Sequence, residues 1–177
     1  MTAPHDIGVT LAIAPTTRGF GYIVFETPDI PMDWGVKEVH RSKTRDCLLK
    51  AQVLMHMLQP SVLVVEDAQH PGSRRSKRVT ILLDKIADLA QQRGITVERC
   101  SRHEVLTAFG RMGAETKDDI AQAVTRLVPE LAPRLPPRRR IWESEHYSMA
   151  IFEAAALALT YFARHGDNGE SKMMTIT

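Results

Sequence analysis

The chain has 177 residues and a formal net charge of +2, and 44% of its residues are hydrophobic and 25% are charged. This length favours one domain with a sizeable core, which we assign to residues 1–165. The chain has two cysteines, no basic segment leading into a long apolar run at its N-terminus, and no apolar run of about 18 residues, which argues against a disulfide-stapled or membrane protein and predicts a cytoplasmic one.

The first part of the chain predicts a meander of three strands. Residues 8–15, 19–27 and 33–39 are rich in Val, Ile, Phe, Tyr and Trp. The turns between them are short, so we expect the strands to pair antiparallel. The first strand runs out of the core at Ala14, a point at which several enzyme superfamilies carry a carboxylate.

The middle of the chain predicts helices alternating with buried strands. Residues 45–59 space their apolar side chains as a helix does and stop before Pro60. Residues 61–67, SVLVVED, are too apolar for a surface strand and predict a buried, parallel one. Residues 73–92 have the spacing of an amphipathic helix, and residues 95–100 predict a fifth strand.

The last part of the chain predicts helices at 102–109, 117–129 and 145–164. The proline- and arginine-rich segment 132–140 reads as a rigid, non-helical link, and residues 166–177 read as a flexible tail. The order is therefore β-β-β-α-β-α-β followed by helices. With a right-handed crossover, this order predicts an α/β fold of the ribonuclease H-like class, a five-stranded mixed sheet flanked by helices.

Two carboxylates stand where burial makes a bare charge costly. Glu66 ends the buried strand, and Glu153 lies in the middle of MAIFEAAALALTYF, a helix that is apolar nearly all round. If the first and fourth strands are parallel neighbours, Ala14 and Glu66 open on the same edge of the sheet. Glu66 and Glu153 then form an incomplete oxygen cage for Mg²⁺ or Mn²⁺, whose missing carboxylate belongs at position 14. The alternatives are a solvated or capping Glu66 and a structural Glu153.

The segments IAPTTRGFGY, VVED, GAETKDDIAQAVTRLV and FEAAALALTYF follow one another along the chain. In this order they resemble the motifs of RuvC-like Holliday junction resolvases. IAPTTRGFGY is similar to the opening motif, in which Ile-Asp-Pro-Gly leads to Gly-Tyr, and VVED is similar to the motif with the catalytic glutamate. GAETKDDIAQAVTRLV resembles the segment whose lysine lies near the scissile phosphate. FEAAALALTYF is similar to the final helix, which usually carries two aspartates three residues apart. The resemblance spans about residues 8 to 162.

The resemblance implies a role for each matching residue. Glu66 matches the metal ligand of the second motif, Lys117 the lysine that faces the phosphate, and Glu153 the later of the two aspartates in the final helix. Ala14 stands in place of the first catalytic aspartate, and Ala150 in place of the earlier acid of the final helix. The implied cofactor is Mg²⁺ or Mn²⁺, held by Glu66 and Glu153.

Several positions stay open at this point. Lys117 also reads as an ordinary surface residue at the start of a capped helix. Glu143, Glu145 and His146 are candidate substitutes for the missing acid, although residues at a helix start are more often solvated or capping. Gln69 stands where the family has an aromatic residue that stacks at the crossover. This departure from the family pattern argues against strict junction geometry.

Basic side chains gather in clusters, which create a local positive field that a polyanion can use although the whole chain is nearly neutral. The alternative for any one cluster is a solvated surface. The residues predicted to bind DNA are Arg74, Arg75, Lys77, Arg78, Lys117, Arg138, Arg139 and Arg140. The two-fold symmetry of a four-way junction predicts a homodimer, with helix 73–92 as the interface. Val79, Leu83 and Ile86 are the candidate contacts if the opposite stripe of this helix faces the sheet.

The resemblance implies a divalent-metal-dependent endonuclease for branched DNA such as Holliday junctions, with no small-molecule cofactor. As given, the chain is expected to be inactive because Ala14 replaces the aspartate. Ala14 reflects either engineering or natural loss, and the survival of Glu66 and Glu153 favours engineering. The alternative is a non-catalytic nucleic-acid-binding module, which the missing acid at Ala150 supports. A sugar-kinase or actin-like nucleotide binder is a third interpretation, but it normally needs a second domain.

Overall fold

A computed structural model describes residues 8–166, so the predicted tail lies outside the described residues from 167 onward. One sheet has the strand order β3-β2-β1-β4-β5, in which β1 pairs antiparallel with β2 and parallel with β4. The strands are β1 (Thr10–Thr16), β2 (Gly19–Thr27), β3 (Ile30–Glu38), β4 (Val62–Glu66) and β5 (Thr96–Cys100). The sequence prediction of a five-stranded mixed sheet is confirmed.

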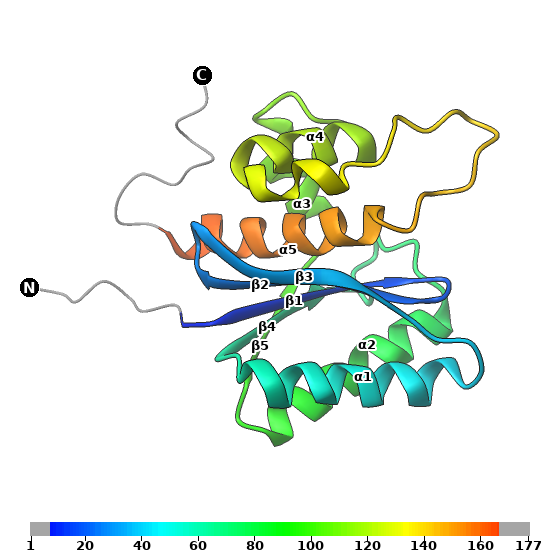
Figure 1. Cartoon of the computed structure of the whole chain (residues 1–177), viewed down its shortest axis with the longest axis vertical. Coiled ribbons are helices and arrows are strands. Elements are labelled where there is room, and N and C mark those ends of the chain that lie inside the picture. Colours follow the sequence, from blue (N-terminus) through cyan, green and yellow to red (C-terminus); the bar gives the residue numbers. More distant parts are fainter. Residues whose placement is uncertain (1–7, 167–177) are drawn as a thin grey trace, which may run out of the picture.

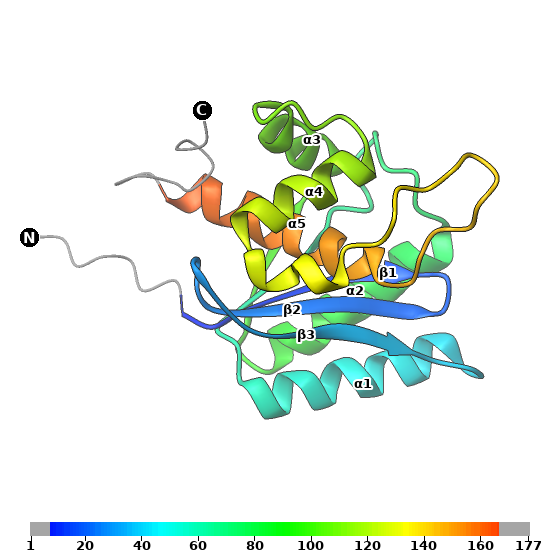
Figure 2. The ribbon, with the colours of Figure 1, turned by 45° about the horizontal axis from the view of Figure 1, so that its top comes forward.

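Helices cover both faces of this sheet (Figure 1). They are α1 (Lys43–Leu58), α2 (Lys77–Gln92), α3 (Arg102–Gly110), α4 (Lys117–Leu127) and α5 (Met149–His165), with a 3-10 helix η1 at Pro129–Arg134. The first two helices pack on one face, whereas α5 lies on the other face with α3 and α4 packed against it (Figure 2). Each face of the sheet therefore has its own hydrophobic core.

Two helices begin later than the sequence predicts. The side chain of Ser76 accepts a hydrogen bond from the backbone N–H of Val79, so α2 begins at Lys77 and residues 73–76 form a loop. Helix α5 begins at Met149 after turns that include a hydrogen bond from the Met149 N–H to the carbonyl of His146. The link predicted to be non-helical begins within η1, where Pro129 occupies the first helical turn.

Close packing fixes α5 over the β1–β2 hairpin. Gly21 pairs with Ala14 across this hairpin. A Cβ atom on Gly21 would lie 2.4 Å from the carbonyl carbon of Ala150 and 2.5 Å from its Cβ. Only the absence of a side chain at Gly21 lets the first turn of α5 approach this closely. The helix that carries Glu153 is thereby held against the end of β1.

The predicted dimer contacts on helix 73–92 need correction. Leu83 and Ile86 are fully buried because the apolar stripe of α2 faces the sheet, and Val79 is partly buried against the same core. Large apolar side chains are exposed on α1 instead: Leu49, Val53 and Met57, at intervals of four residues. Among residues 8–166, no helix is both long and apolar enough to cross a membrane.

Candidate functional site

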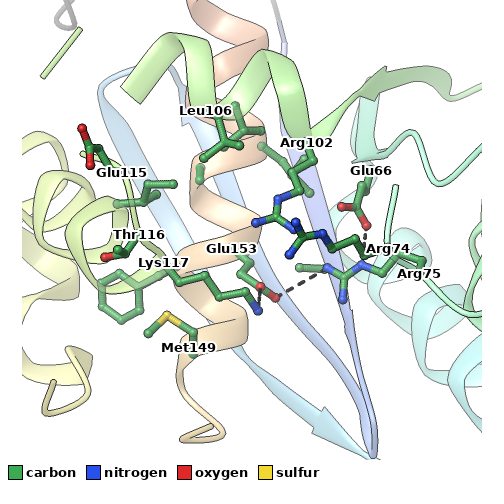
Figure 3. Close-up of a pocket in the computed structure, with 16 residues that line it drawn as sticks. Glu66, Arg74, Arg75, Arg102, Leu106, Glu115, Thr116, Lys117, Met149 and Glu153 are labelled. Carbon is green, nitrogen blue, oxygen red and sulfur yellow. Dashed lines mark hydrogen bonds and ion pairs between the residues drawn. The ribbon is translucent and has the colours of Figure 1, made fainter. Parts of the chain in front are cut away.

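Three positions singled out by the sequence meet at one edge of the sheet. Ile13 and Val65 are partners in the parallel pair of β1 and β4, so the next residues, Ala14 and Glu66, lie side by side at the strand ends. Helix α5 brings Glu153 to the same place, and all three line a cavity of about 260 Å³ (Figure 3). Ala14 is 1% exposed and Glu66 is 9% exposed, so the carboxylate of Glu66 is largely withdrawn from water.

Arg75 spans the two carboxylates. Its Nε lies 2.5 Å from Oε2 of Glu66, and one of its terminal nitrogens lies 3.8 Å from Oε2 of Glu153. Burial lowers the pKa of Arg75, but the charges of Glu153 and Glu66 outweigh burial and hold that pKa above its ordinary value. The guanidinium is therefore a permanent positive charge between a strand end and a buried helix.

Lys117 contacts Glu153, one of these two carboxylates, from the other side of the cavity (Figure 3). Thr116 caps α4, and Asp119 completes the capping box, which makes Lys117 the first residue of the helix. The ammonium of Lys117 lies 2.5 Å from Oε1 of Glu153 and 3.0 Å from Oε2 of Glu145. Burial lowers the pKa of Lys117, but Glu153 and Glu145 more than compensate and raise it. Lys117 is thus both a helix-start residue and part of this site.

The residues present do not fit a divalent cation. Within residues 8–166, no group of three or more His, Cys, Asp or Glu side chains could hold a metal ion. The third position of the predicted cage is the methyl group of Ala14, and Glu66 and Glu153 are already paired with Arg75 and Lys117. A cation entering the cavity would meet two fixed positive charges at contact distance, which disfavours its binding.

Two further arginines line the cavity mouth. Arg74 comes from the loop before α2, and Arg102 is the first residue of α3, after the end of β5. Figure 3 shows both side chains reaching toward the space between Glu66 and Glu153. Sequence reasoning missed Arg102, although a basic residue two positions after the end of the predicted fifth strand was the available signal. Neither arginine forms an ion pair with another residue of the described chain.

A groove of about 580 Å³ continues from the cavity across the end of β1. It shares Arg74, Arg75, Lys117 and Glu153 with the cavity. Its further polar lining comes from the β1–β2 turn, the end of β3, the start of α2 and the segment before α5: Thr16, Thr17, Arg18, Glu38, Ser76, Arg78, Ser144, Glu145, His146 and Tyr147. Cavity and groove together form a continuous surface at the carboxyl ends of the central strands, lined by six cationic and five acidic side chains.

The remaining predicted DNA-binding residues lie around this surface or beyond it. Lys77 and Arg78 are exposed in the first turn of α2. Arg138 pairs with Asp119 of α4 at 3.2 Å. Arg139 and Arg140 are exposed in the segment before α5.

The candidate replacements for the missing acid have other partners. Glu145 pairs with Lys117, Glu143 accepts a hydrogen bond from the backbone N–H of Arg140, and His146 hydrogen-bonds Ser148. Gln69 turns toward α2, where its side-chain amide donates to Asp84. Ala150 is 2% exposed and packs on Gly21.

The fold resembles those of known resolvases. No protein-family model and no curated protein matches the sequence. Among solved structures, RuvC of Thermus thermophilus has a TM-score of 0.62 and 18% identity over 89% of this chain and 96% of that one. The same protein in complex with a Holliday junction substrate has a TM-score of 0.61 and 17% identity over 90% of this chain and 96% of that one. The fowlpox virus Holliday junction resolvase has a TM-score of 0.51 and 11% identity over 89% of this chain and 99% of that one. The chain thus has the RuvC-like resolvase fold that its motifs predict.

Proposed function

We propose that this chain binds branched DNA at the surface formed by the cavity and groove, and that it does so as given without cleaving the DNA. The observation that carries the proposal is the guanidinium of Arg75 between Glu66 and Glu153. In a metal-dependent nuclease, carboxylates hold the ions that neutralise the phosphate and activate water. Here a side chain neutralises the carboxylates, and the group at position 14 is a methyl.

The charges at the site support a phosphate ligand. Four cationic and three acidic side chains line the cavity. Two of the cations, Arg75 and Lys117, balance Glu66 and Glu153, so the remaining lining charges are Arg74 and Arg102 and one further acid, Glu115. Arginines bind phosphate oxygens through paired N–H groups, and phosphate contacts supply most of the affinity of a protein for DNA regardless of sequence.

The fold supports branched DNA as the ligand. One similar structure holds a Holliday junction substrate, and the fowlpox virus protein is also a junction resolvase. Their likeness to this chain extends across nearly the whole length of both partners. We therefore infer that four-way or three-way DNA is the preferred ligand of this chain.

The proposal is tested by measuring binding and incision on the same substrates. The chain is incubated with four-way, three-way and linear duplex DNA in Mg²⁺, in Mn²⁺ or in chelator. We expect tighter binding to the branched substrates, equal affinity with metal and with chelator at matched ionic strength, and no incision. Cleavage of any substrate would contradict the non-cleaving part of the proposal, and equal affinity for branched and linear DNA would contradict the branched preference.

A chain that binds DNA without cleaving it is either an inactivated endonuclease or a non-catalytic nucleic-acid-binding module. In an inactivated endonuclease, the parent sequence carries aspartate at position 14, and the codon or parent sequence at that position tests this directly. In a nucleic-acid-binding module, position 14 has no such parent, and the absence of an acid at Ala150 has the same explanation. The two buried thiols, Cys47 and Cys100, are unpaired, which is in keeping with a cytoplasmic location.

We also propose that the chain acts as a homodimer, because a four-way junction has two-fold symmetry and an isologous dimer matches it. With Leu83 and Ile86 buried, the exposed apolar stripe of α1, Leu49, Val53 and Met57, is the surface for a second copy. Light scattering of the Val53→Glu/Met57→Glu variant is expected to show a monomer where the unchanged chain is a dimer. A monomeric unchanged chain, free and on DNA, contradicts the dimer.

A further inference from the structure

The segment between η1 and α5 holds two large apolar side chains out in solvent. The backbone N–H of Glu143 donates to the carbonyl of Arg140, and the side chain of Glu143 accepts from the Arg140 N–H, which closes a turn. Ile141 and Trp142 occupy the two central positions of this turn and are 95% and 78% exposed. Figures 1 and 2 show the segment projecting away from the rest of the fold.

The turn is tethered to the candidate site at both ends. Before it, Arg138 pairs with Asp119 at 3.2 Å. After it, Glu145 pairs with Lys117 at 3.0 Å, and Lys117 also contacts Glu153. Both anchors belong to the first turn of α4, so the exposed side chains are carried beside the mouth of the cavity and groove. We call residues 138–145 the basic loop.

The chemistry of the basic loop matches a nucleobase. The guanidinium of Arg140 lies 5.8 Å from the ring centre of Trp142, and two more arginines precede it. An exposed indole with adjoining cations offers a flat apolar face for a base and positive charge for the flanking phosphates. A second copy of this loop is a poor partner, because three consecutive arginines would face three others.

We propose that Trp142 stacks on an unpaired or unstacked base of the DNA whose backbone lies in the groove. The proposal rests on the proposed function. A base that is unstacked at a branch point or in a single strand exposes its face, so such a side chain adds affinity for branched or single-stranded DNA and little for linear duplex. Affinity from stacking is tolerant of base sequence, since every base has a π-face.

Tryptophan fluorescence reports this contact directly, because the chain has two tryptophans and Trp34 is partly buried on β3. In the Trp34→Phe variant, Trp142 is the sole fluorophore, and we expect four-way and single-stranded DNA to quench it. In the matched Trp142→Phe variant, the remaining Trp34 is expected to show no quenching. Binding itself is followed by the anisotropy of labelled DNA, so that a missing signal is not confused with missing binding.

Affinity provides the second measurement. Trp142→Ala is expected to weaken binding to branched and single-stranded DNA roughly tenfold, within the range that stacking of one base contributes, and to change duplex affinity little. Trp142→Phe should retain part of the affinity, because a phenyl ring still stacks. Folding of these variants is checked by circular dichroism, and the exposure of Trp142 makes a folding defect unexpected.

The outcomes separate this inference from the proposed function. If branched DNA binds but Trp142 is not quenched and Trp142→Ala binds equally well, the stacking role is wrong while DNA binding stands. If DNA binds to no variant and not to the unchanged chain, both proposals fall. Blue-shifted Trp142 emission with anionic lipid vesicles but not with DNA would assign the loop to a membrane surface, and conversion to a monomer by Trp142→Ala would assign it to the dimer interface. Either result overturns the inference.

Discussion

At the scale of single residues, the guanidinium of Arg75 decides the chemistry of the site. Glu66 and Glu153 are held in a largely buried place where bare carboxylates are costly, and Arg75 offsets that cost without a metal. An arginine does not lose its proton at ordinary pH, so the positive charge between the two carboxylates is not removed by deprotonation of Arg75. A metal ion could take the same place only after the arginine had left it.

The first prediction concerns Ala14 and Arg75 together. Sequence alone suggests that Ala14→Asp restores a metal-dependent nuclease, but the new carboxylate would also face Arg75 across the cavity. We expect Ala14→Asp by itself to bind little Mn²⁺. Compared with Ala14→Asp alone, the double variant Ala14→Asp/Arg75→Gln should bind Mn²⁺ about tenfold or more tightly, because it lacks the positive charge of Arg75 at contact distance.

Isothermal titration with Mn²⁺ and incision of four-way DNA measure this prediction. The matched control is Ala14→Asp/Arg99→Gln, which removes an ion-paired arginine that contacts Asp84 of α2, outside the cavity. Equal Mn²⁺ affinity of Ala14→Asp with and without Arg75 would show that the guanidinium is no obstacle. A double variant that binds Mn²⁺ and branched DNA but never cuts would favour the nucleic-acid-binding module over the inactivated nuclease.

The second prediction is an alkaline loss of stability that depends on Cys100. Burial raises the pKa of Cys100 from 9.0 to about 11. Above about pH 9 the unfolded chain loses this proton while the folded chain keeps it, so the free energy of unfolding falls as pH rises toward the folded pKa. Cys100→Ala removes this contribution, which is on the order of 2 kcal/mol across the window.

Urea unfolding of both proteins from about pH 8 to about pH 11 gives the comparison, since the pKa of a single group determines where its stability is lost. Cys100→Ala has a fixed cost for the lost side chain at every pH, so the test is the slope and not the stability itself. Tyr22, whose pKa burial raises to about 12, is present in both proteins and cancels in the difference. Parallel pH profiles would contradict the role of Cys100.

At the scale of elements, the packing of α5 on the β1–β2 hairpin positions the site. The helix is apolar nearly all round, as its sequence predicts, and residues 149–152 and 154–162 are all buried. Its single acid, Glu153, reaches the cavity because Gly21 lets the first turn of α5 approach the strand pair that ends at Ala14. Register between helix and sheet therefore sets the separation of Glu153 from Glu66.

The third prediction follows from this contact. Gly21→Ala places a Cβ atom 2.4 Å from the backbone of Ala150, and backbone atoms cannot step aside as a flexible side chain does. We expect a loss of roughly 2 kcal/mol or more in the free energy of unfolding, with weaker binding of branched DNA as α5 shifts. The control is Gly110→Ala in α3, where a new Cβ meets nothing within 4 Å and stability should change little or rise. Urea unfolding that gives the same result for both variants would refute the argument from close packing.

At the scale of the whole molecule, a net charge of only +2 conceals an uneven distribution. Arginines and lysines gather at the carboxyl ends of the central strands, around the cavity, the groove and the basic loop. A polyanion responds to this local field and not to the sum over the chain. The end of the sheet that carries the site is therefore the end that DNA should approach.

The fourth prediction tests that approach. The triple variant Arg74→Gln/Lys77→Gln/Arg78→Gln should weaken DNA binding for all sequences about equally and lower the salt dependence of log K by about two to three, because each phosphate contact contributes nearly one unit. Filter binding over a range of salt concentrations measures the slope. The control is Lys85→Gln/Arg93→Gln/Arg126→Gln, three exposed cations that do not line the cavity or the groove. An unchanged slope in the first variant excludes the patch.

The sequence by itself determined the sheet, its flanking helices and the edge of the sheet at which Ala14, Glu66 and Glu153 meet. Alternating and continuous apolar runs specify strands and helices locally, and a glutamate after VLVV or inside an apolar helix marks a buried charge whatever surrounds it. The motif order added the RuvC-like fold. The strands, the helices and the two buried carboxylates could be predicted because each depends on residues that are close in the chain.

Only the tertiary structure decided which charges meet. Arg75 belongs by sequence to a basic cluster, but Ser76 starts α2 at Lys77 and leaves Arg75 on a loop that turns to Glu66 and Glu153. Arg102 and Lys117 reach the cavity from α3 and α4, and Leu83 and Ile86 turn inward because α2 packs on the sheet. Local sequence pattern cannot set these partners, because a long side chain pairs with a charge that the packing of distant elements brings within reach. Burying that charge without a partner would be costly, and this cost favours the ion pairs that the structure shows.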